Sequence, residues 1–184
     1  MCIICNDDYD ITIKKLDCSN CKWIKKIPDN LINLESLDCH NCKGLYLLPP
    51  TLVKLRIITI SHSNIVEIPD TFSNLQFIKC DNSGIKKLSN NFINLRYLYC
   101  FDTKLTEIPK EYTKLIRVIY FRTLIKNIPK TCTKLITDNI AKTTHTTSAP
   151  KNRKEPGKIY FSACKNCKKY YNSNESNECI TCKK

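Results

Sequence analysis

The stretch from Leu95 to Lys114, LRYLYCFDTKLTEIPKEYTK, decides the fold because the same arrangement recurs along most of the chain. Equivalent stretches start 21, 21, 20, 20, 20 and 20 residues apart. The starting residues are Ile13, Leu34, Leu55, Leu75, Leu95, Leu115 and Leu135. A fixed period of about 20 to 50 residues is the mark of a repeat architecture. The sequence therefore predicts a solenoid of six repeats, with a seventh opening at Leu135.

Each repeat begins with alternating apolar residues, which predict one short β-strand per coil. Positions 4 and 6 of the six repeats hold Leu16, Leu37, Ile58, Ile78, Leu98 and Val118, and Cys18, Cys39, Ile60, Cys80, Cys100 and Tyr120. Proline follows in five of the six return segments, and a return of roughly ten residues that contains proline cannot form a long helix. We expect a parallel sheet on the concave side and an irregular or 3-10 convex side. The predicted class is an α/β-type solenoid that is mostly β.

The quoted block is close to the pattern LxxLxLxxNxLxxLPxxLxx, and residues 13–138 resemble leucine-rich-repeat proteins. The short repeats with proline are most similar to those of bacterial effectors, and the composition is similar to that of repeat proteins from large DNA viruses of amoebae. The resemblance implies a right-handed coil. Position 9 departs from the family's asparagine and holds Cys21, Cys42, Ser63, Ser83, Thr103 and Thr123. Serine and threonine hydroxyls can still bond a backbone group inside the coil, whereas a thiol does so poorly.

Two CxxC pairs in the first two repeats imitate a four-cysteine zinc site. They comprise Cys18, Cys21, Cys39 and Cys42. The pairs are 21 residues apart because the repeat is that long, and positions 6 and 9 face the solenoid interior, so we interpret them as buried thiols. The alternative is one zinc ion held by the four stacked sulfurs. Cys2 and Cys5 form a similar pattern with Cys18 and Cys21, and we assign them to an N-terminal cap at residues 1–12.

The C-terminal part lies outside the repeat register. Residues 139–157 lack apolar periodicity and predict a linker, and residues 158–184 form a cysteine-rich module. Its four cysteines, Cys164, Cys167, Cys179 and Cys182, are spaced as two CxxC pairs and predict one structural zinc ion in a fold similar to a zinc ribbon or rubredoxin knuckle pair. A redox-sensitive tail without metal is the alternative. Four ligands are too few for a RING domain.

Charge makes an acidic partner possible. The chain carries a formal net charge of +13, of which residues 139–184 contribute +7 from ten Lys and Arg against three Glu. Nucleic acid could contact the tail through Lys165, Lys168, Lys169, Lys183 and Lys184, with Tyr170 and Tyr171 stacking on bases. The alternative interpretation is a tail whose charge serves solubility alone.

The concave face provides the predicted binding site for a protein partner. Positions 3, 5 and 7 of each repeat should face solvent there, and Asp81 is among them. Repeats four to six supply the candidate residues Phe77, Lys79, Tyr97, Tyr99, Phe101, Arg117, Ile119 and Phe121, flanked by Arg122. Exposed aromatic residues with arginine are typical of binding hot spots. Coverage by the tail or by a second copy is the alternative. The first two repeats are polar at these positions.

Several other functions are not expected. His40, His62 and His145 have no catalytic companions in the sequence, and three scattered glycines cannot form a phosphate loop, so we expect neither an enzyme nor a small-molecule substrate. The chain begins without a secretory signal pattern and has no apolar run long enough for a membrane span. We therefore expect a cytoplasmic protein, in the host cytoplasm if it is viral. A targeting subunit of a ubiquitin-ligase assembly is a further alternative, because the family sometimes supplies one.

Overall fold

The computed structural model describes residues 2–132, 134–136, 161–163 and 170–172. The chain divides into two compact units, Met1–Asn139 and Ile140–Lys184, which are considered separately below.

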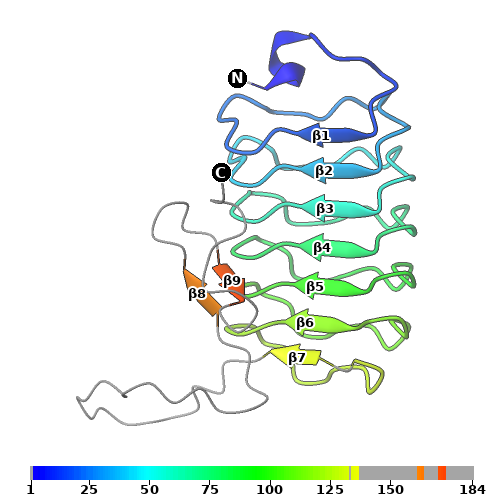
Figure 1. Ribbon diagram of the computed structural model, residues 1–184, viewed down its shortest axis with the longest axis vertical. Coiled ribbons are helices and arrows are strands. Elements are labelled where there is room, and N and C mark those ends of the chain that lie inside the picture. Colours follow the sequence, from blue (N-terminus) through cyan, green and yellow to red (C-terminus); the bar gives the residue numbers. More distant parts are fainter. Residues whose placement is uncertain (1, 133, 137–160, 164–169, 173–184) are drawn as a thin grey trace, which may run out of the picture. The chain divides into compact units, whose positions relative to one another are not determined.

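The first unit is a solenoid whose coils each contribute one short strand to a parallel sheet (Figure 1). It opens with a 3-10 helix, η1 (Ile3–Asn6). The strands are β1 (Lys15–Asp17), β2 (Ser36–Asp38), β3 (Ile57–Thr59), β4 (Phe77–Lys79), β5 (Tyr97–Tyr99), β6 (Arg117–Ile119) and β7 (Lys134–Ile136). They pair in sequence order and in parallel. The sheet confirms the predicted solenoid class.

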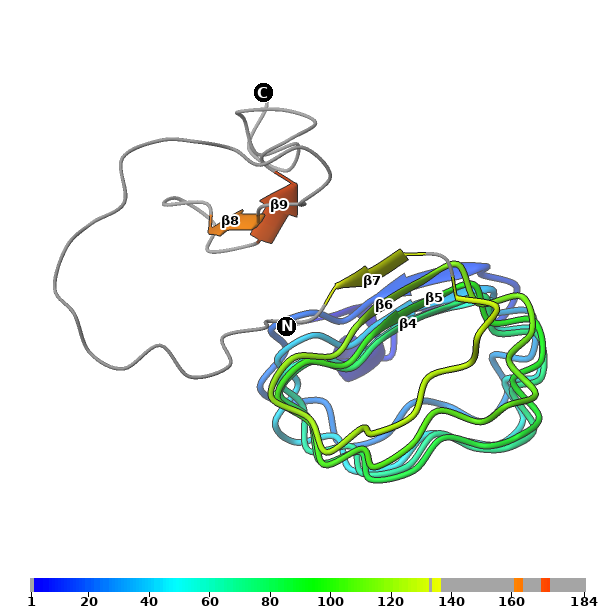
Figure 2. The ribbon, with the colours of Figure 1, turned by 90° about the horizontal axis from the view of Figure 1, so that it is seen from below.

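The interior is built from the apolar positions that the repeat predicts. The position 4 residues and the position 6 cysteines are at most 3% exposed, and these thiols pack as small apolar groups between the leucines. The cysteines of the described part form no disulfide. Viewed along the stack, the coils superimpose around this core (Figure 2).

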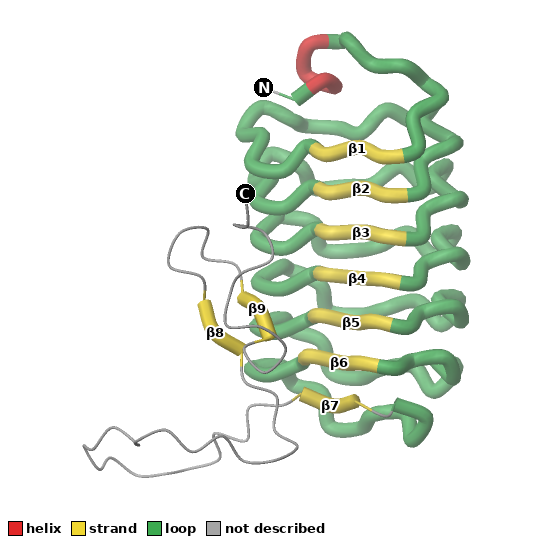
Figure 3. The backbone as a smooth tube through the Cα atoms, viewed as in Figure 1, coloured by secondary structure: helices red, strands yellow, loops and turns green. Residues whose placement is uncertain are grey.

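Paired turns build the convex side. In most coils an N–H bonds back to the residue at the proline position, as from Leu52 to Pro49, and a second turn follows, as from Leu55 to Leu52. Within the described coils 13–132 these turns do not merge into a helix (Figure 3). Side chains then tie neighbouring coils together, because Asn74 Nδ2 donates to the carbonyl of Val53 and Asn94 Nδ2 to that of Ser73.

Position 8 turns the chain out of each strand. The residues there adopt positive φ angles between 52° and 60° and are Asn20, Asn41, His62, Asn82, Asp102 and Arg122. Position 9 follows, and its hydroxyls bond the carbonyl three residues earlier, as from Ser63 Oγ to Ile60 O at 2.6 Å and from Thr103 Oγ1 to Cys100 O at 2.7 Å. The prediction that serine and threonine satisfy the backbone from inside is confirmed.

The last repeat is shorter than predicted. Leu135 pairs with Val118 and so occupies position 4 rather than position 1, which makes the predicted opening at Leu135 wrong by three residues. In the preceding coil Leu115 N–H closes a second turn on Tyr112 before the strand begins. After the turn from Cys132 to Pro129 the chain enters β7 two residues later, so that second turn is absent from this part of the described chain.

The second unit contributes one described hairpin. Strand β8 (Phe161–Ala163) pairs antiparallel with β9 (Tyr170–Asn172). Within the described ranges no helix has the length and apolar character needed to cross a membrane.

Candidate functional site

Aromatic side chains gather on the concave face of the later coils. Phe77 on β4 lies 5.3 Å from Tyr99 and 6.4 Å from Tyr97, both on β5, measured between ring centroids. Phe101 and Phe121, one coil apart, are stacked at 4.7 Å. All five rings are partly exposed. We call Phe77, Tyr97, Tyr99, Phe101 and Phe121 the aromatic face; they line up because odd positions of successive strands point to the same side of the sheet.

Cations border the aromatic face. Lys79 and Arg117 are partly exposed strand residues, and Arg122 is exposed at the positive-φ position after β6. The Nε atom of Arg117 is buried and has no hydrogen-bond partner among the described residues. A buried donor without an acceptor costs free energy.

Two residues of the predicted concave surface are buried. Ile119 is 5% exposed and lies between Tyr99 and Ile136 in the strand register, so it offers almost no surface to a partner. Asp81 is 1% exposed, contrary to the expectation that position 7 faces solvent. Its carboxylate accepts the Phe101 N–H at 3.1 Å and the Ser61 hydroxyl at 3.5 Å. Burial raises the pKa of Asp81 to about 6, although Lys79 and these two donors act in the opposite direction.

The first two coils have a polar concave face. Asp17 and Asp38 accept the N–H groups of Ser19 and His40, so these carboxylates close the turns after their strands. The His40 and His62 rings contact each other edge to face at 5.4 Å and are partly buried rather than fully solvent-facing. Burial and then Lys43 and Lys79 lower the pKa of His62.

Three thiols converge at the N-terminal end of the solenoid. Cys2 Sγ lies 3.7 Å from Cys5 Sγ, and Cys5 Sγ lies 3.5 Å from Cys21 Sγ. All three sulfurs lie within 4.8 Å of one another, and among the described residues they form the one such group of metal-ligating side chains. This cluster could therefore bind a metal ion. The sequence shows the two CxxC pairs, but the prediction made from it assigned Cys2 and Cys5 only to the N-terminal cap.

The sequence alternative of a zinc ion shared by Cys18, Cys21, Cys39 and Cys42 receives less support. The four side chains are buried, as the repeat register predicts. The Cys42 thiol donates to the backbone carbonyl of Cys18 at 2.9 Å. The hydrogen bond that the Cys39 thiol donates to the Cys42 sulfur, followed by burial, raises the pKa of Cys39. The Cys21 sulfur contacts the sulfur of Cys5 in the N-terminal cap at 3.5 Å.

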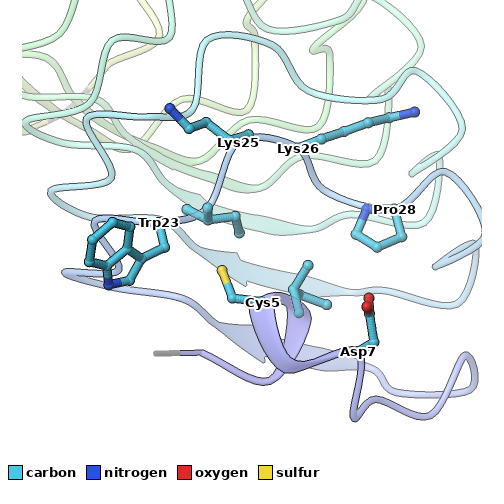
Figure 4. A pocket seen from close by; sticks show the side chains of 8 residues that line it. Cys5, Asp7, Trp23, Lys25, Lys26 and Pro28 are labelled. Atoms are coloured by element: carbon cyan, nitrogen blue, oxygen red, sulfur yellow. The ribbon is translucent and has the colours of Figure 1, made fainter.

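A hollow of about 450 Å³ lies beside the three thiols, between η1 and the first return segment (Figure 4). Cys5 points from η1 toward that segment, while Lys25 and Lys26 extend along the far side. Trp23 lines one end and is 66% exposed. The hollow is open to solvent. Its lining contains no acid–base pair and no further metal ligand beside Cys5 and Asp7.

The predicted C-terminal sites lie outside the described residues. This holds for the zinc ligands Cys164, Cys167, Cys179 and Cys182 and for Lys165, Lys168, Lys169, Lys183 and Lys184. Tyr170 and Tyr171 belong to β9, and the structure describes their backbone alone.

Comparison with solved structures identifies the type of solenoid. Internalin C2 from Listeria monocytogenes is 18% identical, with a TM-score of 0.57 over 67% of this chain and 59% of that one. A leucine-rich-repeat protein from Leptospira interrogans is 20% identical, with a TM-score of 0.57 over 70% of this chain and 38% of that one. The fold is that of a leucine-rich-repeat solenoid. The chain thus spans about three fifths or less of each solved chain. No family model matches the sequence, and no curated protein does.

Proposed function

We propose that this leucine-rich-repeat chain is a non-catalytic scaffold that binds another protein through its aromatic face. The fold supports the general role, since leucine-rich-repeat solenoids typically present their concave surface to protein partners. The observation that carries the proposal is the set of five partly exposed rings, which contact one another in a group of three and a group of two and are bordered by cations.

The composition of the face favours a protein as the ligand. Aromatic residues and arginine are enriched among the residues that dominate the energetics of protein interfaces. Here Phe77, Tyr97 and Tyr99 stand on paired strands, so little of their backbone freedom remains to be lost on binding.

The charges indicate what the partner presents. Lys79, Arg117 and Arg122 border the rings, and Asp81, two residues after β4, is buried. A complementary segment would place apolar side chains over the rings and a carboxylate or carbonyl oxygen against Arg117. The proposed partner is therefore a protein segment with both apolar and acidic residues.

Site-specific photo-crosslinking tests the proposal. A photoreactive phenylalanine at Tyr99 should capture a partner in cells that express the full chain, and the same group at Val66 should not, because Val66 is exposed on a return segment away from the strands. Capture of the same protein from both positions, or from Val66 alone, would argue against the aromatic face.

The zinc module at Cys164, Cys167, Cys179 and Cys182 and its contact with nucleic acid stay predictions from the sequence. Binding to single-stranded nucleic acid that weakens steeply between low and moderate salt, and that deletion of residues 158–184 abolishes, would support that alternative function. Binding that survives the deletion would exclude the tail as its source. The ubiquitin-ligase alternative rests on the family resemblance alone.

A further inference from the structure

The N-terminal end of the solenoid brings together two CxxC turns that are separate in the sequence. The first turn lies at η1, where Cys5 N–H bonds the Cys2 carbonyl at 3.0 Å. The second follows β1, where Cys21 N–H bonds the Cys18 carbonyl at 3.1 Å. Each closed turn places its two cysteines on one side of the chain, which is how CxxC pairs present sulfur ligands.

The sulfur positions match the requirements of zinc. Four thiolates at about 2.3 Å from a tetrahedral Zn²⁺ lie about 3.8 Å from one another. The observed separations are 3.7 Å between the Cys2 and Cys5 sulfurs and 3.5 Å between those of Cys5 and Cys21. Two separations therefore match those of a tetrahedral site, and the Cys2 and Cys21 sulfurs lie within 4.8 Å of each other.

We propose that Cys2, Cys5, Cys18 and Cys21 bind one Zn²⁺ that fastens the N-terminal cap to the first coil. Cys18 supplies the fourth ligand. It shares a CxxC turn with Cys21, it is 1% exposed, and its thiol contacts that of Cys2. Its sulfur is not among the three that already converge, so a small side-chain adjustment completes the site.

The surroundings of Cys21 favour a thiolate. Its sulfur accepts the backbone N–H groups of Cys2 and Trp23, and such bonds stabilise the charge of a metal-bound sulfur. Each remaining thiol releases its proton to solvent when the metal binds.

The cap needs such a fastening. Of residues 2–12 only Ile4 is buried, at 8% exposed, and Cys2, Cys5 and Tyr9 pack against the core while partly buried. Solenoid ends require a cap that shields the last core layer, and short segments with little core use metals for this purpose. The zinc ion would join residues 2–5 to residues 18–21 across the end of the sheet.

The test measures zinc per chain in the full-length protein purified under reducing conditions. The variant Cys164→Ser with Cys167→Ser removes the tail as a zinc source, and it should retain one zinc. Adding Cys2→Ser and Cys5→Ser should reduce this to none. Cobalt added to the tail variant should give the thiolate charge-transfer and tetrahedral ligand-field bands, which the additional changes should abolish.

A matched pair separates a metal ligand from a buried thiol. Cys18 and Cys39 both occupy position 6 of adjacent coils and are 1% and 0% exposed. In the tail variant, Cys18→Ala should weaken zinc binding by more than about tenfold, since removal of a direct ligand exceeds the usual loss from its supporting contacts. Cys39→Ala should leave the affinity unchanged.

Circular dichroism melts establish that each variant folds. The proposal is overturned if the tail variant holds no zinc, if its zinc survives the Cys2 and Cys5 changes, or if Cys39→Ala removes zinc as effectively as Cys18→Ala. None of these outcomes bears on the aromatic face.

Discussion

The first two coils and the next four share one backbone but use position 9 differently. In coils three to six a hydroxyl there bonds the carbonyl three residues earlier in the same coil, as Ser83 does to Cys80. In coil two, the Cys42 thiol instead reaches the Cys18 carbonyl of the preceding coil, and in coil one Cys21 joins the cap thiols. Position 9 thus closes a turn within the coil in coils three to six. In coils one and two it carries a thiol that contacts a neighbouring segment.

The two ends also differ on their surfaces and in their cores. The aromatic face spans β4 to the end of β6, whereas β1 and β2 carry acids that close their own turns. Inside, Phe72, Phe92 and Tyr112 occupy the positions that Leu31 and Leu52 occupy in the first coils. The comparison teaches that the repeat fixes the backbone, while the residues that vary along it place thiols at the N-terminal end and exposed aromatic rings on the later coils.

The largest expected effect concerns Asp81, which is buried in coil four. Burial raises its pKa from 3.8 to about 6, so the folded state loses stability as pH rises from about 4 to about 6. The total loss is about 3 kcal/mol at 1.36 kcal/mol per unit. Asp81→Asn keeps an acceptor for the Phe101 N–H but carries no charge.

Urea unfolding of both proteins across pH 3.5 to 7.5 measures this effect. The free energy of unfolding of Asp81→Asn, relative to the unaltered protein, should rise by about 3 kcal/mol across that range. A difference that stays constant with pH would show that the Asp81 carboxylate is better solvated than its burial indicates.

A smaller effect should distinguish two glycines at equivalent places in coils two and four. A Cβ on Gly44 would lie 2.6 Å from the backbone oxygen of Ile24, whereas one on Gly84 would meet the Val66 side chain at 2.7 Å. Val66 is exposed and can rotate away, but the Ile24 carbonyl belongs to the backbone. Gly44→Ala should cost about 2 kcal/mol of unfolding free energy, and Gly84→Ala less than about 1 kcal/mol.

Denaturant unfolding of the two single variants compares these costs directly. Equal costs would indicate that the return segment of the first coil yields as readily as an exposed side chain, and that the thiol end is less rigid than its packing suggests.

The smallest expected effect on stability comes from replacing the hydroxyl at position 9 with a thiol. Ser83→Ala removes the bond from Ser83 Oγ to the Cys80 carbonyl at 2.5 Å and should cost about 1 kcal/mol. Ser83→Cys should lie between the alanine variant and the unaltered protein, because a thiol is a weak donor. Thermal melts rank the three proteins. If Ser83→Cys melts at the same temperature as the unaltered protein, a thiol and a hydroxyl at position 9 stabilise the coil equally, and the first two coils do not differ from the later ones in this respect.

Periodicity predicted most of the fold because every coil buries the same positions. Strand positions, the parallel order and the buried position 6 cysteines all follow from a repeat of 20 or 21 residues. The repeat did not predict that the last coil is shortened, because nothing in the residues between Pro129 and Leu135 signals that one turn is omitted.

The candidate sites were predicted less completely. Alternation placed the aromatic face correctly on the concave side, but it could not show that Ile119 and Asp81 are covered by neighbouring residues. The approach of η1 to Cys21 depends on how residues 6–14 turn back over the first coil, and no repeat specifies that path. The CIIC and CSNC motifs were the available signal.

The most direct test of the aromatic face is the affinity of the partner captured at Tyr99. Tyr99→Ala with Phe101→Ala should weaken binding by at least about 2 kcal/mol, or roughly 30-fold in Kd, with an unchanged circular dichroism spectrum. The control, Val66→Ala with Ile93→Ala, truncates two exposed apolar residues of the return segments and should leave Kd unchanged. An unaltered Kd for the aromatic pair, or an equal loss in the control, would contradict recognition through this face.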